Sequence, residues 1–293
     1  MHPRSALIPA VALVAAIAGT NARAHHEAIF GPQSSLVLSA PAFVSLQAFS
    51  RRTGQRGSRT QETTALLSAG ATPFQKVPLS FSLIAPMSRI SELDAGTELT
   101  GIEDILVGAR YRFDFEGLQR AFDREGNYGL LMASVEFPTG TVDHPAFRGP
   151  VDGMFAALGG LEWSAFSTIA YAFFRANGPD ALGDRSGDSL FLGSGLAWTP
   201  FDDPVHERLV SLQLGLSHET YLPDVASGRS VERSGGWGLL AHPTVVWGPG
   251  GHVLLFAMTS FPIAQAYADP AQQDRWRVGL GAILLLGQPA PGS

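Results

Sequence analysis

The stretch Gly101–Phe113, GIEDILVGARYRF, decides the fold expected of this 293-residue chain. Alternate residues fall on two sides of it, Ile105, Val107, Ala109, Tyr111 and Phe113 on one and Asp104, Gly108, Arg110 and Arg112 on the other. Such period-2 alternation predicts a β-strand with one apolar and one charged face. Two arginines would be costly in the core of a water-soluble sandwich, whereas the water-filled interior of a membrane barrel accommodates them.

The first 24 residues predict a secretory signal. Arg4 supplies the positive start, residues 6–18 form an apolar run, and Ala22–Ala24 reads as a cleavage site. The run is shorter than the roughly 20 apolar residues of a membrane-spanning helix, and the alternative is a buried N-terminal helix. Cleavage would leave an N-terminal periplasmic segment (25–40), a barrel domain (41–287) and a C-terminal tail (288–293).

The composition narrows the class of protein. Because there is no cysteine, disulfides, thiolate metal sites and a lipid-anchoring cysteine are excluded. The chain is 45% hydrophobic and 16% charged, below the usual quarter, yet no 18-residue apolar stretch follows the signal. Without Arg4 and Arg23, the 20 basic residues fall to 18 against 26 acidic ones, a net charge of −8. This balance argues against a nucleic-acid partner.

The same alternation recurs in segments close to the length of a tilted membrane strand. Twelve strands are expected, at residues 42–50, 62–68, 77–85, 101–113, 128–137, 153–163, 168–175, 189–199, 208–221, 237–247, 252–261 and 276–286. Long polar loops alternate with mostly short turns, the asymmetry of outer-membrane barrels. The connection after Asp114 is the exception, and a helical turn is one reading of it. We therefore predict an all-β, antiparallel, up-and-down transmembrane barrel of about 12 strands.

A soluble two-sheet protein also alternates, but three observations favour the barrel. Charged residues lie within strands, and the apolar strand faces would give a soluble protein too much exposed apolar surface. Aromatic rings gather near strand ends, where they fit the interface girdles of a membrane barrel. These rings are Tyr111, Phe113, Phe137, Trp163, Trp198, Tyr221, Trp237, Trp247, Phe261 and Trp276.

The polar faces supply the candidate functional residues. We expect Asp104, Arg110, Arg112, Glu136, Gln213, Arg275 and Arg277 to line the barrel interior. Such residues can form a charged constriction that selects solutes. They can equally form salt bridges that stiffen and plug the barrel.

Metal and enzyme sites have weaker support. His25 and His26 at the mature N-terminus are candidate metal ligands, but without a third fixed ligand a solvated tail is the favoured reading. No serine-hydrolase elbow, zinc-protease, Walker or dinucleotide motif is present. We therefore predict neither an enzyme nor a cofactor.

Two short motifs carry a family resemblance. Gly101–Phe113 and Glu136–Gly140 (EFPTG) resemble segments of outer-membrane transporters of the phenol-degradation meta-pathway family. The resemblance implies an outer-membrane barrel that passively admits small solutes, aromatic or hydrophobic ones among them, with membrane lipid as its other partner. The last strand departs from many outer-membrane strands because it ends in LLLG without a terminal aromatic. The alternatives are a non-transporting barrel with a structural, binding or metal-resistance role and a soluble periplasmic β-protein.

Overall fold

The computed structural model describes residues 42–286, apart from 56, 74–76, 78, 115–127, 142–149, 164, 181, 204–207 and 233. Strands dominate these residues, together with one 3-10 turn, η1 (Pro270–Gln272). The strands are β1 (Ala42–Thr53), β2 (Thr60–Ala71), β3 (Leu79–Glu92), β4 (Thr97–Ile102), β5 (Ile105–Asp114), β6 (Tyr128–Phe137), β7 (Asp152–Trp163), β8 (Phe166–Ala176), β9 (Ser189–Asp203), β10 (Arg208–Tyr221), β11 (Val225–Ala226), β12 (Arg229–Ser230), β13 (Gly236–Gly250), β14 (Val253–Tyr267) and β15 (Asp274–Leu286). The helical turn considered after Asp114 lies outside the described residues.

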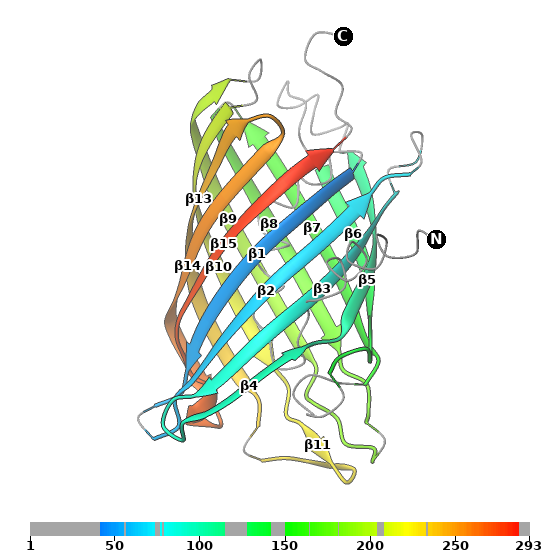
Figure 1. Ribbon diagram of the computed structural model, residues 1–293, viewed down its shortest axis with the longest axis vertical. Coiled ribbons are helices and arrows are strands. Elements are labelled where there is room, and N and C mark those ends of the chain that lie inside the picture. Colours follow the sequence, from blue (N-terminus) through cyan, green and yellow to red (C-terminus); the bar gives the residue numbers. More distant parts are fainter. Residues whose placement is uncertain are drawn as a thin grey trace, which may run out of the picture.

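The sheet closes on itself into an antiparallel barrel with tilted strands (Figure 1). Each wall strand pairs with its sequence neighbours, β1 pairs with β15, and β2 pairs with β3. Because β4 and β5 follow one another along β3, they count as a single wall strand. The wall therefore has twelve strands, which confirms the predicted fold. Closure leaves no unpaired edge, as a strand structure in lipid requires.

The deciding stretch is interrupted where a continuous strand was expected. β4 ends at Ile102 and β5 begins at Ile105, opposite Pro86 of β3. Proline has no N–H to donate to the ladder, and one extra residue bulges from the β4–β5 side. The bulge turns two consecutive acidic residues, Glu103 and Asp104, away from solvent, so that both are almost fully buried.

Alternation along the strands sorts side chains between the two faces of the wall. In β10, Leu212, Leu214 and Leu216 are exposed on the outer face, while Ser211 and Ser217 are buried on the inner face. The alternation had suggested a polar inner face, but the observed inner face is mixed. Phenylalanine, leucine, isoleucine and methionine side chains also point inward and pack together.

Connections differ at the two ends of the barrel. At the end where β15 finishes, the turn between β13 and β14 consists of Gly251 and His252, whose φ angles of 66° and 63° fit a type I′ hairpin turn. At the opposite end, residues 177–188 and 222–235 form longer loops, and the second carries the β11–β12 hairpin, which lies beyond the rim in Figure 1. Among the described residues, no helix is long and apolar enough to cross a membrane.

Candidate pore and its charged lining

The charged interior residues gather at the long-loop end of the barrel. They lie at the finishing ends of β1, β6, β8 and β10 and at the starts of β2, β7 and β15, which antiparallel order brings to one level. Among the described residues, the buried charged side chains are seven carboxylates and four guanidinium groups, a formal charge of −3. Those at the long-loop end are Glu62, Glu103, Asp104, Glu136, Asp152, Glu219 and Asp274, with Arg51, Arg175 and Arg277. The fourth guanidinium group, that of Arg110, lies nearer the opposite end, because Arg110 pairs with Ser80 at the start of β3.

Arg277 is the centre of the larger ion cluster. Its two terminal nitrogens donate to the two carboxylate oxygens of Glu219 at 2.5 and 2.7 Å. It also donates to Asp274 at 2.6 Å, and Asp274 accepts from Arg51 at the same distance. β13 and β14 separate β10 from β15 in the sheet, so the bidentate pair bridges strands that are not neighbours. Its fork geometry is the strongest form of a charge-assisted hydrogen bond.

Arg175 holds a second cluster on the opposite arc of the wall. It donates to Asp152 at 2.5 Å and to Glu136 at 2.8 Å, joining β8 to β7 and β6. Asp152 also accepts from the backbone N–H of Gly178, at the start of the loop after β8. The cluster therefore ties the wall to an outer loop.

The two motifs of the family resemblance lie side by side in this region. Asp104 accepts from the backbone N–H of Gly140 at 2.7 Å, and the hydroxyl of Thr139 accepts from Ile105 N–H at 2.8 Å. The segment after β6 thus satisfies backbone and carboxylate groups that the bulge leaves without ladder partners. Neither contact is readable from strand alternation.

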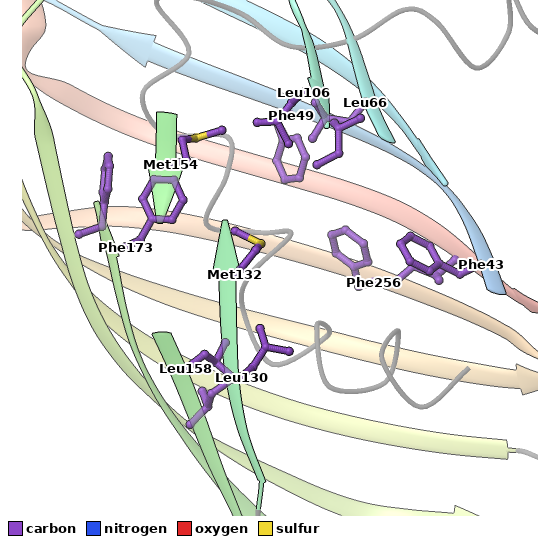
Figure 2. Packing of buried hydrophobic residues seen from close by; sticks show 14 of the residues in the cluster. Phe43, Phe49, Leu66, Leu106, Leu130, Met132, Met154, Leu158, Phe173 and Phe256 are labelled. Atoms are coloured by element: carbon purple, nitrogen blue, oxygen red, sulfur yellow. The ribbon is translucent and has the colours of Figure 1, made fainter. Parts of the chain in front are cut away.

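The rest of the interior combines apolar side chains with buried polar ones such as Ser45, Gln47 and Ser82. Inward side chains from strands around the wall form one cluster, and Figure 2 shows Leu130 and Met132 of β6 near Met154 and Leu158 of β7. Its aromatic members include Phe43, Phe49, Phe173, Phe191 and Phe256.

Several interior polar atoms have no hydrogen-bond partner in the protein. They include Oε1 of Gln47 and of Gln213, Oγ of Ser134 and of Ser189, and the hydroxyl of Tyr267. These atoms come from five different strands around the wall. Buried polar groups are normally paired with protein or with water, so these are the interior atoms with hydrogen-bonding capacity left for water or a solute.

A cavity of about 410 Å³ opens among the side chains at the long-loop end. Arg51, Glu62, Tyr221 and Tyr267 line it from the wall, and Asp224 lines it from the loop after β10. Tyr221 donates its hydroxyl to Glu219 at 2.8 Å, which connects the cavity wall to the Arg277 cluster. The cavity therefore lies within the charged region, between the wall and the loop after β10.

Six of the seven residues expected in the interior lie on the inner face. Asp104, Arg110, Glu136 and Arg277 are buried, and Arg112 and Gln213 are half-buried. Arg275 is exposed and donates to the carbonyl oxygen of Gly54 at 2.9 Å. A register shift between Arg52 and Thr53 changes the alternation at this end of β15 and places Asp274 inside instead.

The aromatic residues expected near the interfaces fall into three groups. The outward, exposed rings are Tyr111, Phe137, Trp198, Trp237, Trp247 and Phe261, while Phe113 and Trp276 are half-buried. Tyr221 points inward and is part of the charged lining. The side chain of Trp163 and the candidate ligands His25 and His26 lie outside the described residues.

His242 is an interior residue that sequence patterns did not single out. Its Nε2 and Nδ1 lie 2.7 Å from the hydroxyls of Ser217 and Ser260 respectively. The pairing resembles a nucleophile–base contact, but Nδ1 meets a serine where a hydrolase triad has a carboxylate. Elsewhere in the described chain, no group of three or more His, Cys, Asp or Glu residues is placed to hold a metal ion.

Comparisons with known proteins bear on the fold. No family model and no curated protein matches the chain. Among solved structures, it is similar to an outer-membrane channel from Pseudomonas putida F1, with a TM-score of 0.69 and 11% identity over 84% of this chain and 95% of that one. The chain has the fold of an outer-membrane β-barrel.

Two autotransporter barrels are less similar. The β domain of the Bordetella autotransporter BrkA gives a TM-score of 0.52 at 11% identity, over 84% of this chain and all of that one. The translocator domain of NalP from Neisseria meningitidis gives 0.51 at 15% identity, over 93% of this chain and 99% of that one. At such identities, the likeness concerns the barrel architecture.

Proposed function

We propose that the barrel is an outer-membrane channel through which small solutes diffuse passively down their gradients. The observation that carries the proposal is the closed wall with exposed leucine rows outside and unpartnered polar atoms inside. Lipid suits the outer face and water suits the inner face. The predicted export signal and the barrel fold fit the outer membrane, with the long loops outside the cell.

The interior favours solutes that carry an apolar or aromatic part. The charged residues alone would suit small hydrophilic solutes, but the apolar cluster, which overlaps them and continues along the barrel, offers contacts to hydrophobic ones. Selectivity in pores depends on diameter, lining charge and hydrophobic constrictions, and the inner face supplies charged and apolar side chains for the second and third of these. This arrangement supports the solute class that the family resemblance implies.

A liposome-swelling assay tests the proposal. Purified barrel reconstituted into vesicles is expected to admit small sugars and small aromatic acids at rates that fall with solute size. Heat-denatured barrel, added in equal amount, is the control. A heat-modifiable, folded barrel that swells vesicles no faster than this control would favour a plugged barrel acting through its external loops.

A further inference from the structure

Four inward aromatic rings lie against glycines of a neighbouring strand. The pairs, each directly opposite in the sheet register, are Phe43–Gly70, Phe49–Gly279, Tyr171–Gly193 and Phe256–Gly281. A Cβ added to these glycines would lie only 2.3, 2.6, 2.1 and 2.3 Å from the respective ring. Each ring therefore occupies the space that a side chain of the neighbouring strand would otherwise take.

Two of the pairs share β15. Gly279 receives the Phe49 ring from β1, and Gly281, the next inward position, receives the Phe256 ring from β14. The side chain of Met258 also approaches the Gly279 position, at 2.9 Å. This part of the wall is covered by side chains of the two flanking strands, and β15 adds no side chain at these two inward positions.

We infer that these glycine–aromatic pairs set the aperture of the pore and so act as specificity-determining residues. The inference rests on the proposed channel function and deepens it. A ring that lies on a glycine stays close to the wall, whereas a ring displaced from that position has to turn toward the axis. The pairs thus hold an aromatic lining against the wall, and they select solutes by cross-section.

The Phe43 pair also positions a charge. The guanidinium carbon of Arg110 lies 5.9 Å from the centroid of the Phe43 ring, within the range of a cation–π contact. The ring contacts Gly70 of β2 and meets a cation from β5. A displaced Phe43 ring would therefore alter the position of an interior charge as well as the width of the bore.

Gly281→Ala tests the inference in the full-length barrel, reconstituted in planar bilayers with potassium chloride as the conducted salt. The added methyl would overlap the Phe256 ring, at 2.3 and 2.4 Å from its Cε1 and Cζ atoms. We expect single-channel conductance to fall about two-fold, because the ring narrows the path. Gly215→Ala is the matched control, since its nearest neighbour, Cβ of His242, lies at an ordinary 3.5 Å, and its conductance should be unchanged.

A double-mutant cycle separates ring displacement from other effects. In a Phe256→Ala background the obstructing ring is absent, so Gly281→Ala should change conductance little. Heat-modifiable gel mobility establishes that each variant is folded; if Gly281→Ala fails to fold, Gly193→Ala against Tyr171→Ala provides the same cycle. A folded glycine variant with wild-type conductance, or an equal loss in the ring-deleted background, overturns the inference alone. A wild-type barrel that conducts no ions overturns the channel function and the inference together.

Discussion

Removing Arg277 should destabilise the barrel more than removing any exposed arginine. Glu219 is 0% exposed and Asp274 is 1% exposed, and Arg277 donates to both. In Arg277→Met, Glu219 still accepts a hydrogen bond from the hydroxyl of Tyr221, and Asp274 still accepts one from Arg51. Breaking a buried ion pair costs about 3–5 kcal/mol. We expect a loss of about 3 kcal/mol in the free energy of unfolding, the lower end of that range, because both carboxylates keep one of these partners.

Reversible urea unfolding in lipid vesicles, followed by fluorescence of the five tryptophans, measures this loss. Arg275→Met is the control, because Arg275 is exposed and makes one hydrogen bond to a backbone carbonyl; its effect should stay within about 0.5 kcal/mol. Glu219→Gln combined with Arg277→Met should recover at least about 1 kcal/mol of the loss, as residues in contact couple. The argument fails if Arg277→Met and Arg275→Met unfold at the same urea concentration.

Three further predictions follow from charge and from the two faces of the wall. The formal interior charge of −3 predicts cation selectivity; a reversal potential of the anion-selective sign in a potassium chloride gradient would contradict it. Leu280, outward at the middle of β15 and 62% exposed, should tolerate arginine poorly, with a loss of about 2–4 kcal/mol in vesicle unfolding. The inward change Gln213→Arg should cost less than about 1 kcal/mol, so equal losses would refute the assignment of faces. The Arg59 guanidinium holds the pKa of the Asp94 carboxyl well below its usual range, so this clamp between two outer turns should persist at neutral pH and loosen only as pH falls through that lowered pKa. Limited proteolysis of the loop at residues 54–59 across pH, with Asp94→Asn as the comparison, measures it.

The barrel was predictable because its evidence is local and repeated. Alternation in β10 and β15 depends only on the period of a strand, and twelve such segments require a closed sheet in lipid. The same period placed Glu136 and Arg110 on the inner face. It failed at Arg275 and around Glu103, where an irregularity shifts the alternation. Pro86 is a sequence signal for the second irregularity, since proline interrupts the hydrogen-bond ladder between strands.

The composition of the site was less predictable because its contacts join residues distant in sequence. Glu219 and Arg277 are 58 residues apart, and the sequence of neither strand indicates that the two side chains pair. The inward phenylalanines had a local signal: Phe43 and Phe49 stand on the same face as Ser45 and Gln47. Alternation shows such a face as mixed, and only the closed barrel shows that these rings point away from lipid.

The mixed inner face has a physical reason, because charged side chains alone would not suit an interior through which solutes pass. An interior lined entirely by long charged side chains would either fill with salt bridges or leave carboxylates unpaired, and both outcomes oppose passage of solutes. Here the ion clusters are confined to one end, and glycines lie opposite inward aromatic rings along the rest of the wall. On the inference above, the ion clusters contribute stability and the glycine–aromatic pairs set the aperture, from different segments of the same strands. β15 contains both, with Asp274 and Arg277 at its start and Gly279 and Gly281 directly after them. A substitution at Asp274 or Arg277 should accordingly change unfolding more than conductance, and one at Gly279 or Gly281 should change conductance more than unfolding.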